Sequence, residues 1–276
     1  MAQAQIVLNP AEAKKLIAHA VLKLPEVQSA RKEGVIVLHP SSSTFFIYEE
    51  LTGKQPEGLW VCGVIAPRGL TGSLEAEEMI KARGAGAHDP RKVSRQAWFF
   101  RRGVLQEAAS LGEILDQMQE SDVYIKGVNA VDANGNTGVL FANPAGGGGT
   151  IGKVLTAQRD RKFHIVLPVG HEKLIPGSIK EACLAANRKP ELTMGLPCGL
   201  FPVTGRKVDE IEALSVLFGV EACVISAGGL GGAEGSVVLA INGEKEKTEE
   251  AFCYAKEIKG AKLPILRVSE ATKWPE

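Results

Sequence analysis

Residues 41–44, Ser-Ser-Ser-Thr, form a run of small hydroxyl side chains where an apolar strand is expected to meet its helix. Hydroxyls at such a junction can cap the helix and can also donate hydrogen bonds to an anion. A cap requires one hydroxyl, so a longer run favours ligand binding; the alternative is that Ser41 or Ser42 only caps the helix. The residues expected to contact an anion here are Ser41, Ser42, Ser43 and Thr44.

A second group of polar residues follows a later apolar strand and contains Lys126, Asn129 and Asp132. A lysine at the end of a buried strand must be paired or solvated in a cleft, so Lys126 and Asn129 are expected in a pocket. Asn134-Gly135 is a strong hairpin signal, and for Asp132 and its neighbours alone a turn is the favoured interpretation. Asp132 is also the nearby carboxylate able to accept a proton.

A third group begins with glycines 146–149, which open an apolar helix. Backbone N–H groups at a glycine-rich helix start form a natural anion site, and a lysine one turn further on adds positive charge. A mobile linker is the alternative explanation of such a run. The residues expected to bind phosphate here are Gly147, Gly148, Gly149, Thr150 and Lys153.

Another glycine-rich stretch, residues 228–235, lies between two expected strands. It superficially resembles a dinucleotide-binding fingerprint, but no helix follows it, so that interpretation fails. A flexible hairpin is favoured, and a lid over the pocket is the alternative.

Expected strands and helices alternate through the first two thirds of the chain. Interleaving of this kind predicts an α/β fold with a mostly parallel sheet covered by helices on both faces. Residues 68–95 are polar and are interpreted as a loop or lid. The main expected strands are 34–38, 59–66, 122–128 and 163–168, and the main expected helices are 10–23, 45–51, 150–159 and 178–187.

The order of elements changes after residue 195. Residues 200–268 are expected to form strand, helix, strand, strand, helix and strand, which is a ferredoxin-like α+β order. We therefore predict an α/β domain over 1–195 that carries the ligand cleft, an α+β domain over 196–268 acting as a lid or in dimerisation, and a tail over 269–276. An apolar edge of the small domain suggests a homo-oligomer.

The composition excludes several classes of function. The 32 basic and 32 acidic side chains give zero formal charge, and no basic block favours nucleic acid as a partner. The longest apolar runs are strand-length, so no membrane span is expected, and the first residues lack a secretory signal. Five cysteines and five histidines are scattered without metal-ligand spacing. We expect a cytoplasmic protein with free thiols and neither metal nor cofactor.

Together, the hydroxyl turn, the loop after the middle strand and the glycine run resemble a known fold superfamily. It contains ribose-5-phosphate isomerase, the CoA transferases, glucosamine-phosphate deaminase and the initiation-factor-2B-like isomerases. Lys126-Gly127-Val128-Asn129 falls on the Asp-Gly-Ala-Asp motif of the pentose isomerases, residues 147–149 on their glycines, and Ile151-Gly152-Lys153 on their Arg-Glu-Lys. The resemblance covers about residues 34–174 and implies the fold and a small anionic, phosphorylated or CoA-type ligand.

The carboxylates of that family are replaced here by Lys126, Asn129 and Gly152. If the protein is an isomerase of phosphorylated sugars, Asp132 is the expected base and Lys126 the expected electrostatic stabiliser. Two alternatives remain open: a non-catalytic binding or regulatory protein, and an acyl-CoA transferase or hydrolase with Glu234 as nucleophile.

Overall fold

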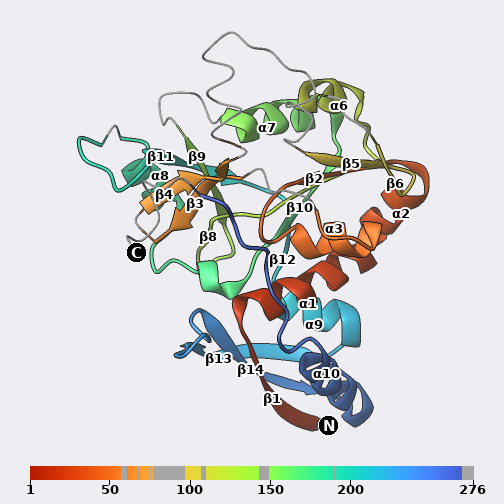
Figure 1. The fold of residues 1–276 in the computed structure, drawn as a ribbon. Helices are drawn as coiled ribbons and strands as arrows, with labels where there is room; N and C mark the ends of the chain where they lie inside the picture. The colour runs from red at the N-terminus through yellow and green to blue at the C-terminus, as the bar shows by residue number, and fades with distance from the viewer. Residues whose placement is uncertain are drawn as a thin grey trace.

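The fold comes from a computed structural model that describes residues 1–56, 61–67, 69–74, 76, 97–106, 110–142, 149–188 and 190–268. It combines helices with several sheets, which makes the protein a mixed α/β fold (Figure 1). The expected loop or lid at 68–95 lies largely outside the described residues.

The largest sheet has six strands in the order β12-β10-β7-β2-β5-β6. The first four run parallel, and the last two add antiparallel at one edge. The strands are β2 (Val35–His39), β5 (Trp98–Arg101), β6 (Val104–Leu105), β7 (Val123–Lys126), β10 (His164–Pro168) and β12 (Arg206–Val208).

Both faces of this sheet are covered, because alternate side chains of one strand enter different cores. Ile36 and Leu38 pack with α1 and its neighbours, whereas Val35 and Val37 pack on the other side. The first face is covered by α1 (Pro10–Lys23), α2 (Pro25–Glu33), α3 (Phe45–Thr52) and α9 (Glu210–Phe218), and the second by α6 (Leu111–Gln117) and α7 (Gly149–Arg161). The expected parallel arrangement is thus present in the four adjacent strands.

A smaller sheet, in the order β11-β9-β8, lies beside the large one and is antiparallel throughout. Its strands are β8 (Ala130–Val131), β9 (Thr137–Ala142) and β11 (Cys198–Val203), and α8 (Ile179–Ala186) packs against it. A separate antiparallel pair consists of β3 (Cys62–Ala66) and β4 (Gly69–Gly72). A mostly parallel sheet therefore does not describe the whole chain.

The expected ferredoxin-like order is wrong. The third sheet has the order β1-β14-β13, formed by β1 (Ala2–Leu8), β13 (Glu221–Gly228) and β14 (Ser236–Gly243), with α10 (Lys245–Glu257) packed on it. Residues 200–203 belong instead to β11, which pairs with β9, and 264–267 form no strand. The N-terminal strand, seven residues long, is in full register with β14, so a distant segment completes this sheet.

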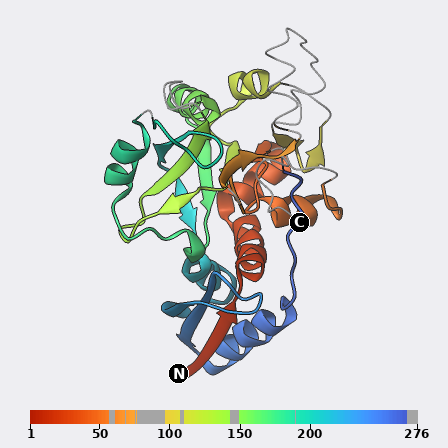
Figure 2. The ribbon, with the colours of Figure 1, turned by 60° about the vertical axis from the view of Figure 1, so that its left-hand side comes forward.

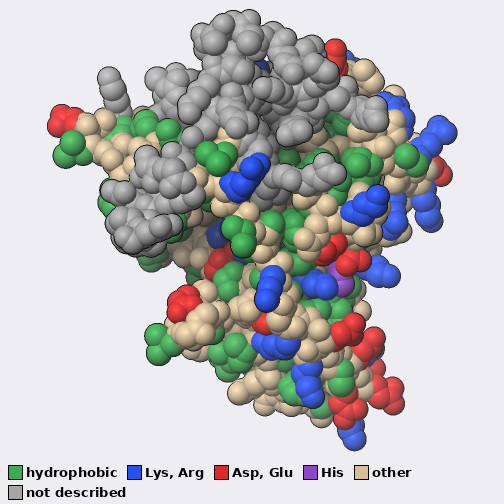
Figure 3. Space-filling model, viewed as in Figure 1, with side chains coloured by type: hydrophobic (Ala, Val, Ile, Leu, Met, Phe, Trp, Pro, Cys, Tyr) green, Lys and Arg blue, Asp and Glu red, His purple; other side chains and the backbone are tan. Residues whose placement is uncertain are grey.

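Figure 2 shows the three-stranded sheet with α10 at the end of the molecule opposite α6 and α7. After α10 the chain runs back, and Leu74 N donates to Arg267 O at 2.9 Å. Acidic and basic side chains are interspersed around α10 on the face seen in Figure 3. Within the described part of the chain, no helix has both the length and the apolar character needed to cross a membrane.

Candidate functional site

The carboxyl ends of β2, β7 and β10 meet at one edge of the large sheet. After β10, a 3₁₀ turn, η2 (His171–Lys173), carries Lys173 toward the other two strand ends. Lys173 Nζ donates to Ser43 Oγ at 3.0 Å and to the Val128 carbonyl at 2.8 Å. Burial, together with the charge of Lys14, lowers the pKa of Lys173 to about 8. One ammonium therefore joins the loops that follow three neighbouring strands.

The hydroxyls of Ser41 and Thr44 hydrogen-bond within their own loop, whereas that of Ser43 accepts from Lys173. Thr44 Oγ1 donates to the His39 carbonyl at 2.7 Å, and the Thr44 N–H donates to Ser41 Oγ at 3.2 Å. Ser43 and Thr44 are buried, whereas Ser41 and Ser42 are partly exposed. The loop after β7 approaches closely, since a Cβ on Gly127 would lie 2.7 Å from Ser41 Oγ. Most of these hydroxyls thus shape the junction of the two loops.

Lys126 is buried beside His39, its register partner in the neighbouring parallel strand. The buried His39 ring has a pKa well below its ordinary value, because of desolvation and the charge of Lys126. His39 Nδ1 lies 2.9 Å from the Tyr124 hydroxyl, whose pKa is raised by burial. Asn129 is exposed, yet its side chain bonds Gly63 O and Leu140 N and so connects β3 with β9.

Asp132 occupies the turn between β8 and β9, as expected for the Asn134-Gly135 signal. Its Oδ1 accepts from the N–H groups of Asn134 and Asn136, and its Oδ2 accepts from the N–H of Ile179 at 3.0 Å. The Asn136 side chain adds a bond of 2.9 Å to Oδ2. Hydrogen bonding by Asn136 and then by Ile179 lowers the pKa of Asp132. The carboxylate fixes both the turn and the start of α8.

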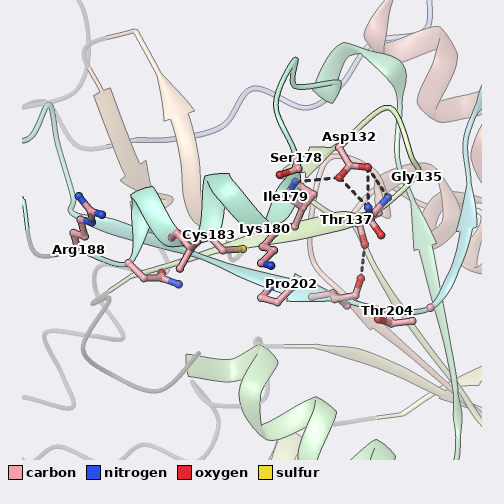
Figure 4. A pocket seen from close by; sticks show the side chains of 15 residues that line it. Asp132, Gly135, Thr137, Ser178, Ile179, Lys180, Cys183, Arg188, Pro202 and Thr204 are labelled. Carbon is pink, nitrogen blue, oxygen red and sulfur yellow. Dashed lines mark hydrogen bonds between the residues drawn. The ribbon is translucent and has the colours of Figure 1, made fainter.

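Two cavities flank this turn, and Asp132 and Gly135 line both. The larger, of about 730 Å³, lies between α8 and the β9–β11 pair. Figure 4 shows Lys180 and Cys183 on the face of α8 toward Pro202, with Arg188 at the far end. Between residues that the structure describes, neither the Lys180 nor the Arg188 side chain forms a hydrogen bond or ion pair. The wall of the larger cavity therefore includes two exposed, positively charged side chains.

The smaller cavity, of about 360 Å³, is lined by residues that include His171, Lys207 and Asp209. His171 Nδ1 lies 2.5 Å from Glu210 Oε2, and Lys207 Nζ donates to Asp209 Oδ2 at 2.6 Å. This cavity combines an imidazole, an ammonium and carboxylates, which are groups able to move protons or hold an anion.

Behind His171, a buried ion pair joins the turn to α1. Lys14 Nζ contacts Glu172 Oε1, while Glu172 Oε2 is buried and has no hydrogen-bond partner among the described residues. Burial favours the neutral acid, but the charges of Lys14 and Lys173 outweigh it and lower the pKa of Glu172. Gly170 leaves room for this carboxylate, because a Cβ there would lie 1.9 Å from Oε2.

The two glycine-rich segments differ in how they relate to this region. Gly147 and Gly148 lie outside the described residues, whereas Gly149 and Thr150 begin α7 and Lys153 is exposed on it. Among the described residues, no hydrogen bond or ion pair links Lys153 to residues 41–44 or to Asp132.

The 228–235 stretch is a hairpin loop between β13 and β14, as favoured from the sequence. Its last glycine lies beside Glu172, since a Cβ on Gly235 would be 3.7 Å from Glu172 Cβ. Glu234 is exposed, with Oε2 accepting from Gly232 N at 2.9 Å. A nucleophilic role for Glu234 stays a prediction.

Sequence reasoning missed His171, Lys173 and Glu210. A usable signal was present, because His171-Glu172-Lys173 follows an apolar strand almost directly, as Lys126 ends one. The missing information was the position of Glu210, which lies 39 residues further along the chain.

Comparisons with known proteins give little guidance. No family model matches the chain, and no curated protein matches it. One similar solved structure is a 5-methylthioribose 1-phosphate isomerase from Pyrococcus horikoshii, with 12% identity and a TM-score of 0.33. The match covers 72% of this chain and 55% of that one, so this chain corresponds to about half of the isomerase. Among the described residues, no group of three or more His, Cys, Asp or Glu side chains is placed to hold a metal ion.

Proposed function

We propose that this protein binds a phosphorylated small metabolite in the larger cavity, with Lys180 and Arg188 holding the phosphate. The observation that carries the proposal is the pair of cations without hydrogen-bond or ion-pair partners, among described residues, in a cavity of about 730 Å³. Small-molecule sites commonly have volumes of about 300–1,000 Å³. Arginine binds phosphate oxygens in a bidentate manner, and lysine adds a compact positive charge.

The wall between the two cations is mainly apolar. Cys183 and Leu184 on α8 face the same cavity as Pro202 and Val203 on β11. Such a surface suits the carbon skeleton of a metabolite while the charged ends hold its phosphate. The anion site predicted at residues 41–44, 129, 147–150 and 153 stays a separate prediction, and none of these residues that the structure describes lines the larger cavity.

For catalysis, we propose isomerase-like proton transfer on a phosphorylated sugar, with Asp132 as the base and Lys126 as an electrostatic stabiliser. Asp132 lines both cavities, which supports a position beside a bound ligand. Its lowered pKa keeps it ionised near neutral pH but makes it a weaker base.

A non-catalytic binding protein is the second candidate, and one observation favours it. The Asp132 carboxylate already accepts hydrogen bonds from Asn134, Asn136 and Ile179, so abstracting a proton would compete with structural bonds. In that case Asp132 shapes the cavity, and the protein binds its ligand without turnover.

A thermal-shift series tests the binding proposal. Purified protein is mixed with ribose 5-phosphate, ribulose 5-phosphate, AMP or CoA. A ligand present at about 100 times its dissociation constant adds roughly 2.7 kcal/mol of stability. We expect a sugar phosphate to raise Tm, and the double substitution Lys180→Ala with Arg188→Ala to remove the shift.

Lys153→Ala is the matched control, because Lys153 is an exposed lysine on another helix. Loss of the shift in this variant but not in the Lys180/Arg188 variant would move the site to the glycine run. No shift with any of the ligands would overturn the proposal. Turnover of a bound sugar phosphate that disappears with Asp132→Asn would favour the enzyme over the binding protein.

A further inference from the structure

The His171 ring is held in a fixed orientation at the rim of the smaller cavity. Its Nδ1 lies 2.5 Å from Glu210 Oε2, and its backbone N–H lies 3.1 Å from both oxygens of the same carboxylate. The Glu210 side chain is only 1% exposed, whereas that of His171 is 18% exposed. A buried carboxylate thus fixes the tautomer and position of a ring that still reaches the cavity.

The other ring nitrogen, Nε2, faces a different environment. Asp209 Oδ2 lies 4.0 Å from Nε2, which is beyond hydrogen-bond distance. Asp209 is in turn engaged by Lys207 at 2.6 Å and by the Glu212 N–H at 2.9 Å. Among the described residues, no hydrogen bond engages Nε2, so this nitrogen can donate a proton to, or accept one from, a molecule in the cavity.

The charged groups around His171 come from several elements. Asp209, Glu210 and Lys207 lie on β12 and the start of α9, Glu172 and Lys173 share the 3₁₀ turn, and Lys14 reaches in from α1. The hydrogen bond that the ring makes to the Glu210 carboxylate has the largest effect and raises the pKa of His171. The negative charges of Glu210 and Asp209 also raise this pKa, whereas burial and the charge of Lys207 lower it. The net effect on His171 is a raised pKa, which favours the imidazolium form relative to an imidazole in water.

Asp132 lines the same cavity, because the chain after η2 runs back beside β8. Ile175 N donates to the Val131 carbonyl at 2.9 Å, and Val131 forms a parallel bridge with Leu174. The cavity thus contains a carboxylate and a Glu-backed histidine on adjoining segments. Paired groups of this kind are what proton transfer next to a carbonyl requires.

We propose that His171 is the proton-transfer group for the oxygen atoms of a carbonyl ligand in the smaller cavity, with Glu210 as its positioning residue. The inference rests on the proposed isomerase-like function and adds a residue to it: the phosphate of the ligand lies in the larger cavity, its carbonyl end lies in the smaller one, and Asp132, which lines both, is the base. As Asp132 removes the proton from the carbon beside the carbonyl, the C–H electron pair forms the C=C bond of an enediol. The carbonyl π electrons take the proton from Nε2. In the second half, the neighbouring hydroxyl returns a proton to Nε2 as the carbon proton is delivered to the other carbon.

The first test uses diethyl pyrocarbonate, which acylates unprotonated imidazole, with peptide mass spectrometry of the intact protein after reaction from pH 5 to 8. The protein contains its own references. His164 is exposed, whereas the His19 ring contacts both Glu50 and Tyr254, and His39 is buried against Tyr124. His164 serves as the reference for access to the reagent. We expect His171 to react with a profile at higher pH than in the Glu210→Gln variant, and the buried His39 to react least.

Glu210→Gln should move the His171 profile to lower pH, by about tenfold in rate at pH 6 for each unit of pKa lost. If this variant does not fold, the more conservative Glu210→Asp replaces it in the same comparison with the wild type. An unreactive His171 at pH 8, or a His171 profile that the change at Glu210 leaves in place, overturns the proposal. This result needs no ligand and is therefore independent of the proposed binding function.

The second test measures deuterium incorporation from D₂O into a sugar phosphate that binds in the thermal-shift series, by NMR. We expect exchange at the carbon beside the carbonyl, a loss of at least about 100-fold in His171→Gln, and retained binding. Glu210→Gln should reduce exchange and displace its pH profile in the same direction as the acylation profile. Unchanged exchange in His171→Gln overturns the proposal while leaving the binding function intact.

Discussion

Lys173 and Ser43 lie 130 residues apart in the sequence and are joined by a hydrogen bond of 3.0 Å from ammonium to hydroxyl. The same ammonium donates to the Val128 carbonyl at 2.8 Å. It therefore fastens the loops after β2 and β7 to the turn after β10. Because the three strands are parallel neighbours, their polar ends lie close enough for one lysine to bridge them.

The first prediction concerns the pH dependence conferred by Lys173. Its pKa is about 8 in the folded protein and about 10.4 in an unfolded chain, so the unfolded state binds more protons between these values. Stability should therefore increase with pH across this window in the wild type relative to Lys173→Met. Urea unfolding at pH 7.5, 9 and 10 measures the difference. The exposed Lys153→Met should keep the wild-type slope; equal slopes in all three proteins would contradict the assignment.

A second prediction concerns the buried pair of Lys14 and Glu172, whose side chains are 4% and 14% exposed. Lys14→Met leaves a buried carboxylate without its cation and should reduce the free energy of unfolding by about 3 kcal/mol or more. The exposed pair Lys245–Glu249 supplies the control, and Lys245→Met should change stability by less than about 0.5 kcal/mol. Both losses are measured by denaturant unfolding. Similar losses in the two variants would show that the buried pair contributes no more to stability than the exposed pair.

The third prediction uses Gly170. Its φ of −86° suits alanine, so any loss in Gly170→Ala reflects contacts and not backbone strain. The added Cβ would lie 1.9 Å from Glu172 Oε2 and 3.1 Å from Glu210 Oε1, which should displace Glu172 from Lys14. We expect a loss of about 1–3 kcal/mol.

In Gly112→Ala, by contrast, the nearest described atom to the new Cβ is Ser110 Oγ at 3.9 Å, and a gain of about 0.5–1 kcal/mol is expected. The two variants should thus change the free energy of unfolding in opposite directions. A Gly170→Ala protein as stable as the wild type would mean that the Glu172 side chain can adopt another position without loss of stability.

A fourth prediction concerns acid stability and Asp132. Its pKa is lowered in the folded state, so its contribution is present above the unfolded pKa, about 3.9, and is lost as the pH falls through the folded value. Asp132→Asn should lower Tm at pH 7, and the difference from wild type should shrink as the pH falls below about 4. Asp160→Asn, at an exposed position on α7, should match the wild type throughout. A difference in Tm that does not change with pH would mean that Asp132→Asn destabilises the protein only through the geometry of the turn.

Much of the local structure follows from neighbouring residues. Gly53 ends α3 with φ of 69°, and the Asn134-Gly135 pair forms the expected turn. Asn9 and Glu12 make a capping box at the start of α1. Each of these depends on groups only a few positions apart, so residue type and spacing are enough to predict them.

The tertiary structure alone decided which strands pair and which charges meet. The alternation in residues 200–268 is compatible with a four-stranded sheet. In the structure, however, seven residues of β1 pair with β14, and residues 200–203 pair with β9. Likewise, the types of His171 and Lys173 are evident in the sequence, but their partners Glu210 and Ser43 lie 39 and 130 residues away. Residue spacing specifies local periodicity and turns, whereas contacts between distant segments depend on how the whole chain excludes water from its cores.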